Sequence, residues 1–220
     1  NLFEGYMSGT QNIFREAFEE RFMYGDYLIH NENAFKDSIF FDGESQITEA
    51  DQVRVFTQLN SSKDVDISLK RLHFNGTITN GELTTQIIGE GVDVFTADEM
   101  RLPLWKWNAS AGRPLHSGAG EILLGEELGR LLDCQLKDGT KNFRADGGYA
   151  QNEKGFDCPY KQLQLASTTE TGSLNAIFLE AVGVQNSMFR EIDSRLVVVN
   201  LKDAQSLVNT TGISLISVKL

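Results

Sequence analysis

The sequence predicts an α+β fold in which a β-α-β piece at each end of the chain brackets a central, mostly-β insert. Two observations predict it. Strand-like alternation and helix-like periodicity follow one another near both ends of the 220-residue chain. The stretch between them, from about Arg101 to Val184, has a different character, because it holds both tryptophans, both cysteines and all three prolines.

The first residues predict one amphipathic helix, from Leu2 to Tyr24. Its apolar side chains recur close to every 3.6 residues, and Glu and Arg side chains supply most of the opposite face. Gly25 follows, at a position where glycine commonly ends a helix. This helix is interpreted either as a surface helix or as the outward continuation of a membrane-spanning helix that would precede Asn1.

Local signals predict the remaining elements of the N-terminal part. A short strand is expected at 27–30, and Thr48 followed by Asp51 predicts a capped helix start. Asn80-Gly81 lies between two alternating segments, which is a strong signal for a hairpin. The strands of that hairpin are expected at 65–74 and 83–89, and a short helix at 94–100.

The insert and the C-terminal part follow the same logic. Asn200 and Asp203 are suited to cap the last helix. The sequence predicts strands at 121–124, 161–167, 175–184, 195–200 and 214–220, and helices at 126–132 and 202–208. Residues 1–100 and 185–220 are therefore assigned to one discontinuous subdomain, and residues 101–184 to an inserted subdomain.

Composition excludes several functions. Hydrophobic residues make up 40% of the chain and charged residues 23%, which is typical of a globular protein. Twenty Lys and Arg against 31 Asp and Glu give a formal charge of −11, which repels nucleic acid, and no basic patch offsets it. No run approaches the ~18 apolar residues that cross a bilayer. Because it begins at Asn1 without a signal peptide, the chain is expected to be a piece of a larger protein.

Cys134 and Cys158 enclose a polar segment rich in Gly, Asp and Asn. They are interpreted either as a disulfide that closes this loop, in an oxidising compartment, or as two free thiols. A disulfide over a loop of this length would contribute roughly 3–4 kcal/mol.

No pattern in the sequence predicts catalysis. There is no phosphate-binding loop and no G-x-S-x-G turn. His30, His73 and His116 lie far apart in sequence, and no pair has metal-ligand spacing. Catalytic residues, bound cofactors and metal ions are therefore not expected. Trp105 and Trp107, one residue apart, are expected on one face of a strand, either as a platform for a partner or sugar or buried between subdomains.

Several segments together resemble the extracytoplasmic domain of FtsX-like ABC transporter permeases, the type that includes MacB exporters and the lipoprotein-releasing permeases LolC and LolE. Residues 24–30 are similar to the strand after the first transmembrane helix, although Asp26 replaces the usual His. Residues 88–93 are similar to a Gly-Val-Asp turn. Other similar segments are 69–76, 111–115, 121–132, 181–184, 192–193 and 201–207, with Gly129 where Ala is usual. The loop between the cysteines departs from the family pattern.

The resemblance implies a porter-like, split β-α-β subdomain with an inserted mostly-β subdomain, as in the MacB periplasmic core. It also implies a non-catalytic domain that couples ATP hydrolysis, in a separate or fused cytoplasmic ATPase, to export or release of a lipoprotein, drug or peptide. The full-length protein would span the bacterial inner membrane, with this segment on the periplasmic side. Its partners would be the ABC ATPase, a second permease copy or paralogue, and a periplasmic carrier or membrane-fusion protein. Trp105 and Trp107 are the predicted partner contact.

A different class of function fits the residues as well. The chain would then be a free-standing periplasmic or secreted ligand-binding module, with the two tryptophans as its binding platform. This alternative predicts a cleavable signal peptide and ligand affinity in isolation. The permease interpretation predicts apolar helices on both sides of the segment.

Overall fold

The computed structural model describes residues 11, 15, 17–34, 45–116, 118, 120–136, 144, 149–151, 153–187 and 189–220. Most of the helix predicted from Leu2 lies outside these residues. Its described end, η1 (Ala17–Arg21), is a turn of π-helix that stops three residues before the predicted end at Tyr24. Met23 there adopts a positive φ of 58° and Gly25 one of 66°, and the first strand begins at Tyr27.

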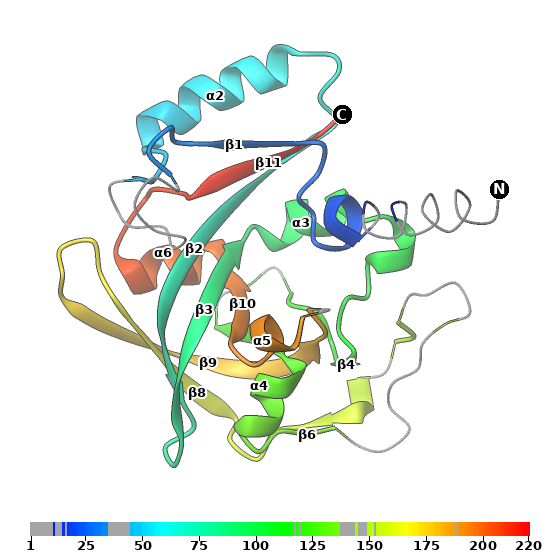
Figure 1. Cartoon of the computed structure of the whole chain (residues 1–220), viewed down its shortest axis with the longest axis vertical. Coiled ribbons are helices and arrows are strands. Elements are labelled where there is room, and N and C mark those ends of the chain that lie inside the picture. The colour runs from blue at the N-terminus through cyan, green and yellow to red at the C-terminus, as the bar shows by residue number, and fades with distance from the viewer. Residues whose placement is uncertain are drawn as a thin grey trace.

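One mixed sheet dominates the described part of the chain (Figure 1). Its strands are β1 (Tyr27–His30), β2 (Ile67–Thr79), β3 (Thr84–Val92), β4 (Ala111–Gly112), β5 (Glu121–Gly125), β8 (Gln162–Thr168), β9 (Leu174–Gln185), β10 (Leu196–Asn200) and β11 (Leu215–Lys219). The helices are α2 (Glu49–Ser61), α3 (Val94–Met100), α4 (Glu126–Leu131), α5 (Arg190–Asp193) and α6 (Leu201–Val208), with 3₁₀ turns η3 (Pro103–Trp105) and η4 (Glu153–Gly155). A separate ladder joins β6 (Gln135–Leu136) to β7 (Phe156–Asp157).

Local signals in the sequence account for these elements. Thr48 Oγ1 accepts a hydrogen bond from the Asp51 N–H and caps α2, as predicted. The Asn80 side chain accepts from the Glu82 and Leu83 N–H groups and closes the predicted β2–β3 hairpin. Helix α3 has the predicted bounds. The other strands and helices predicted from residue 27 onward agree to within two residues, except that β2 continues five residues past its predicted end, to Thr79, and β3 three residues past, to Val92.

Two split β-α-β crossovers confirm the predicted fold class. β11 is antiparallel to both β1 and β2, so β1 and β2 run parallel with β11 between them and α2 connecting them. β10 is parallel to β3, and β10–α6–β11 is a second parallel crossover with β2 and β3 between its strands. The two crossovers therefore interlock at β11, which takes part in both.

The strand pairings also form a ring. β2 pairs β3, β3 pairs β10, β10 pairs β5, β5 pairs β9, β9 pairs β8, and β8 returns to β2 at residues 77–79. Helix α6 contacts five of these six strands and buries Leu201, Ala204, Leu207 and Val208 against them. The two predicted subdomains thus share one sheet, and the division of the chain at residues 101 and 184 stays a prediction.

The two faces of β2 serve two hydrophobic clusters. Leu72, Phe74 and Ile78 belong to the larger cluster, which α6 completes. Leu69, on the opposite face, belongs to a smaller cluster under α3 and the N-terminal segment. The alternation of β2 therefore places odd-numbered side chains, such as Arg71, toward the segment that leads into β1.

Candidate functional site

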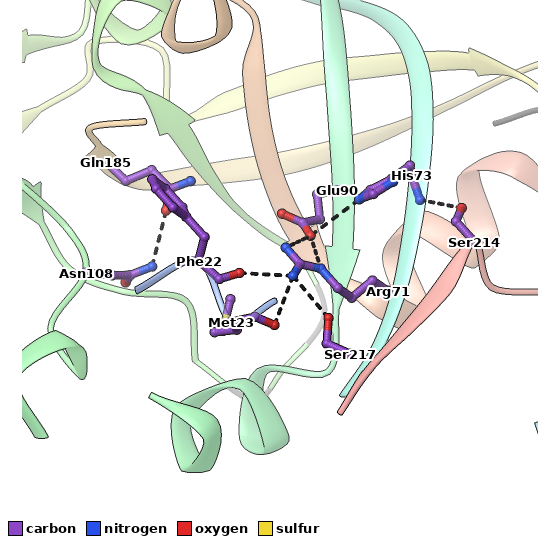
Figure 2. A network of polar contacts seen from close by, with 9 residues as sticks. All are labelled: Phe22, Met23, Arg71, His73, Glu90, Asn108, Gln185, Ser214 and Ser217. Carbon is purple, nitrogen blue, oxygen red and sulfur yellow. Dashed lines mark hydrogen bonds and ion pairs between the residues drawn. The ribbon is translucent and has the colours of Figure 1, made fainter. Parts of the chain in front are cut away.

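The most heavily connected polar group in the described residues is Arg71, which holds the entering N-terminal segment against the sheet (Figure 2). One terminal nitrogen, Nη1, donates to the carbonyl oxygens of Phe22 at 3.0 Å and Met23 at 3.1 Å, and to Ser217 Oγ on β11 at 3.3 Å. Its Nε and other terminal nitrogen, Nη2, bind the Glu90 carboxylate on β3. One side chain therefore ties residues 22 and 23 to three strands.

The register of the hairpin explains why these charges meet. His73 stands directly opposite Glu90, and Arg71 is two residues earlier on β2, so the three side chains share a face. His73 Nε2 lies 3.6 Å from Glu90 Oε1. The backbone N–H of His73 donates to Ser214 Oγ at 2.8 Å, which ties the network to the start of β11 (Figure 2).

The ion pair is buried, and its electrostatics follow from that. Arg71 is 1% exposed. Burial alone would raise the pKa of Glu90, but the charge of Arg71 and the contact with His73 outweigh burial and hold this pKa at about 2. Arg101, at the end of α3, is also buried, and burial lowers the pKa of its guanidinium to about 10 even though Asp98 and Glu90 oppose the shift.

Tyr24 covers the outer side of this pair. Its ring centroid is 4.2 Å from the Arg71 guanidinium carbon, within cation-π distance. Burial raises the pKa of the Tyr24 hydroxyl, although the positive charge of Arg71 opposes the change. Backbone carbonyls, an ion pair and a ring therefore fix three consecutive residues, 22 to 24, in place.

A second arginine ties the same segment to the predicted insert. Arg21, the last residue of η1, donates to the Tyr149 hydroxyl at 3.1 Å and to the Asn186 carbonyl at 2.5 Å. Its guanidinium carbon lies 5.3 Å from the Trp105 ring centroid and 5.5 Å from that of Tyr149. Residues 21–24 thus contact β2 and β11 through Arg71 and the segment 101–186 through Arg21.

The tryptophans are not arranged as predicted. Trp105 ends the 3₁₀ turn η3, which begins at Pro103, and Trp107 follows it outside any strand, so the two do not form a strand face. Pro103 favours a helical turn at this point because its φ is fixed and it has no N–H. Both tryptophans are partly buried, and both ring N–H groups lack a hydrogen-bond partner. Their role as a partner contact stays a prediction.

The two cysteine sulfurs are bonded in the structure, and the Cα atoms lie 4.1 Å apart. The bond stands beside the short β6–β7 ladder, and Cys134 is 2% exposed at the edge of the main hydrophobic cluster. Most of the polar loop that the bond closes, including Asp138 and Asp146, lies outside the described residues.

The described residues contain no group of three or more His, Cys, Asp or Glu side chains that could hold a metal ion. Within the part of the chain that the structure describes, no helix is long and apolar enough to span a membrane. His73 lies beside Glu90 and His116 beside Glu121, while His30 contacts the carbonyl of Asn31.

Sequence reasoning missed Arg71 and Glu90. The one available signal is the pair of charged residues between two leucines in Leu69-Lys70-Arg71-Leu72. Alternation assigns Arg71 to the same face as Leu69, which belongs to the second cluster and is fully buried. A charge at such a position requires a partner, but the pattern does not identify Phe22, Met23 or Ser217 as that partner.

Glu90 makes the protein sensitive to acid. Its pKa lies at about 2 in the folded chain against 4.5 for a free glutamate, so its contribution to stability is full above pH 4.5 and is lost as the pH falls from there to 2. The loss is expected to be roughly 3 kcal/mol. Urea unfolding between pH 7 and pH 2 measures it. In Glu90→Gln the free energy of unfolding should change less between pH 4.5 and pH 2 than in the wild type. The same pH dependence in both proteins would contradict the prediction.

No family model matches the sequence, and the comparison with curated proteins gives no match. Solved structures do match. The chain is similar to the extracellular domain of the noncanonic ABC-type transporter YknZ from Gram-positive bacteria, with 15% identity and a TM-score of 0.49 over 87% of this chain and 81% of that one. It is also similar to the periplasmic region of MacB from Actinobacillus actinomycetemcomitans, with 9% identity and a TM-score of 0.47 over 88% of this chain and 72% of that one. Both are extracytoplasmic regions of ABC-type transporters, the class of domain that the sequence resembles.

Proposed function

We propose that this chain is the extracytoplasmic domain of an ABC transporter permease, and that it couples ATP hydrolysis in the cytoplasm to export or release of a substrate outside the inner membrane. The domain itself is non-catalytic. The ATPase is a separate subunit or a fused domain, and the permease works with a second copy or a paralogue. The substrate class is a lipoprotein, a drug or a peptide, handed to a periplasmic carrier or a membrane-fusion protein.

The observation that carries the proposal is the side-by-side arrangement of the entering and leaving strands. β1 pairs β11, and the Asp26 carboxylate accepts a hydrogen bond from the Leu220 N–H at 2.9 Å. A domain inserted between two membrane-spanning helices needs its entry and exit close together, and this pairing supplies that geometry. The sequence resemblance supports the same topology independently.

The contacts of residues 21–24 suggest how displacement reaches the domain. Arg71 attaches this segment to β2, β3 and β11, and Arg21 attaches it to Trp105, Tyr149 and the Asn186 carbonyl. A movement of the preceding helix is then passed to the sheet and to the predicted insert together, because neither attachment has a flexible linker between it and η1. Transmission in this form needs rigid elements with more than one arrangement.

Membrane topology tests the proposal against the free-standing binding module. Lys106 is exposed, and both native cysteines are in a disulfide, so Lys106→Cys adds the one thiol among the described residues. In the full-length protein of intact spheroplasts, a membrane-impermeant maleimide should label this variant, and the protein should stay in the membrane after carbonate extraction. The wild-type protein is the unlabelled control.

Two results would contradict the proposal. Release of the protein by osmotic shock, after cleavage of a signal peptide, would favour the free-standing module. Labelling that occurs only after the membrane is broken would place the domain on the cytoplasmic side. Sequencing the gene on both sides of the segment gives an independent check, since the proposal requires apolar runs of ~20 residues before Asn1 and after Leu220.

A further inference from the structure

One stretch of the strand ring has an open edge. β3 pairs β2 along its whole length, but on its other side β10 begins only at Ile88, so in the described residues Thr84–Ile87 have no strand beyond them. The Ile88 N–H donates to the Arg195 carbonyl at 2.9 Å, toward the β10 side. Because the backbone groups of a strand alternate in direction, the N–H and C=O of Gln86 point to that same side. The edge can therefore hydrogen-bond to an added strand.

A cavity of about 380 Å³ begins at this edge and extends across β2 to the β8–β9 hairpin. Residues of β2 and β3 form part of its lining, and the β8–β9 hairpin contributes residues 166–168 and Leu174. Ile88, which is partly exposed, adds apolar surface, while the Ile87 side chain is buried in the main hydrophobic cluster, and Arg195 also lines the cavity. Leu174 is 80% exposed, which is unusual for a leucine and leaves its side chain available to a ligand.

Arg195 supplies the charge of this cavity. It is exposed, and its side chain makes no hydrogen bond or ion pair with any described residue. Most other arginines described here are paired with a carboxylate or a carbonyl, as Arg71, Arg101, Arg113 and Arg130 are. In a chain of net charge −11, an unpaired guanidinium beside an apolar cavity is suited to a carboxylate of a partner.

The direction of β10 determines which carboxylate fits. β10 runs parallel to β3 and starts with Leu196 beside Ile88. A peptide that lies against Thr84–Ile87 parallel to β3 continues the line of β10 backward, so its C-terminal end arrives where β10 begins, next to residue 195. An antiparallel peptide would instead bring its amino terminus to the arginine, which is electrostatically unfavourable.

We propose that this edge binds the C-terminal end of an extended peptide by strand addition. The peptide backbone pairs with Gln86, the terminal carboxylate binds the Arg195 guanidinium, and an apolar side chain near the terminus occupies the cavity that Ile88 and Leu174 line. The open stretch of four residues matches the last four residues of a peptide. This inference does not rest on the proposed function and stands or falls separately from it.

Three pools of hexapeptides of random sequence, passed over the immobilised 220-residue chain, test the proposal, and the retained peptides are sequenced. Fluorescence polarisation then measures the affinity of a selected peptide. The first pool has a free C-terminal carboxylate, the second is amidated, and the third is amidated but carries an internal Asp. We expect retention of the first pool, with apolar residues enriched near the terminus. A selected peptide should bind about tenfold more weakly once amidated. Its binding should shift the amide resonance of Gln86.

Matched variants locate the site. Arg195→Gln should weaken the free acid about tenfold and leave the amidated peptide unchanged, while Arg190→Gln makes the same charge change on nearby α5 and should have no effect. Leu174→Ser should weaken binding, while Phe178→Ser, also exposed on β9 but outside the cavity, should not. Leu174 and Phe178 are exposed enough that neither change should prevent folding.

Four outcomes would overturn the proposal. These are equal binding of acid and amide, preference for the internal Asp pool, no effect of Arg195→Gln, and no retention of any pool by a chain whose circular dichroism shows it folded. Preference for the internal Asp would mean that the guanidinium binds a side-chain carboxylate and that the parallel orientation is wrong.

Discussion

Replacement of Arg71 by methionine is expected to lower the free energy of unfolding by roughly 3–5 kcal/mol. Arg71 is 1% exposed, and its guanidinium donates to the carbonyls of Phe22 and Met23 and so holds both residues against the sheet. Its removal leaves the Glu90 carboxylate without its ion-pair partner in a site where burial disfavours the charge. Urea denaturation at pH 7 measures the change.

Arg54→Met is the matched control. Arg54 pairs with Asp51 on the surface of α2, and its side chain is 78% exposed, so this change should cost less than ~1 kcal/mol. Amide exchange at residues 22–25 should quicken in Arg71→Met and stay unchanged in Arg54→Met. If both variants lose the same stability, Arg71 does not hold the N-terminal segment in place.

As the pH falls, the difference in free energy of unfolding between Arg71→Met and the wild-type chain should become smaller. Without the arginine, burial raises the pKa of Glu90 above its usual 4.5. Protonation as the pH falls then removes the cost of a buried, unpaired carboxylate, and the variant loses less stability than the wild type. The wild type instead loses stability in the same range, because its Glu90 has a pKa of about 2. The double variant Arg71→Met/Glu90→Gln should recover part of the loss at pH 7.

Loss of the Cys134–Cys158 bond is expected to cost about 3–4 kcal/mol, from the chain entropy of a loop that spans 24 residues. The variants Cys134→Ala, Cys158→Ala and the double variant should all show the same loss, since each removes the same cross-link. The melting temperature of each, with and without dithiothreitol, measures it.

The reductant is also the control for this cross-link. Dithiothreitol should lower the melting temperature of the wild-type chain to that of the variants and leave the double variant unchanged. A single variant that melts well below the other would show that packing of the buried Cys134 side chain, rather than the cross-link, carries the effect.

Local chemistry made much of this fold predictable. Thr48 and Asn80 bond within three residues of themselves, so their roles can be read from neighbouring letters. The hairpin and the α3 bounds follow for the same reason. The order of the predicted elements indicated a β-α-β piece at each end of the chain around a central insert, and the resemblance to permease domains implied the same split arrangement.

The site depends on partners that are distant in sequence. Arg71 meets Phe22 and Ser217 across separations of 49 and 146 residues, and Arg21 meets Asn186 across 165. No periodicity reports such contacts. The helix predicted to reach Tyr24 ends earlier, because Met23 adopts a positive φ of 58°, which is not a right-handed helical conformation. The carbonyls of Phe22 and Met23 accept hydrogen bonds from Arg71. The prediction that Trp105 and Trp107 share one face of a strand is wrong, because Pro103 begins a 3₁₀ turn at this point of the chain.

The position of β11 between β1 and β2 has a consequence for how the chain reaches its native state. Tyr27–His30 has no strand partner until Leu215–Val218 arrives, almost at the end of the chain. The first strand therefore stays unpaired while nearly 190 further residues are synthesised. A segment in that position is exposed to proteases and to mispairing for the whole interval. The time at which β1 reaches its native pairing is therefore set by when β11 becomes available, and not by how early β1 itself is formed.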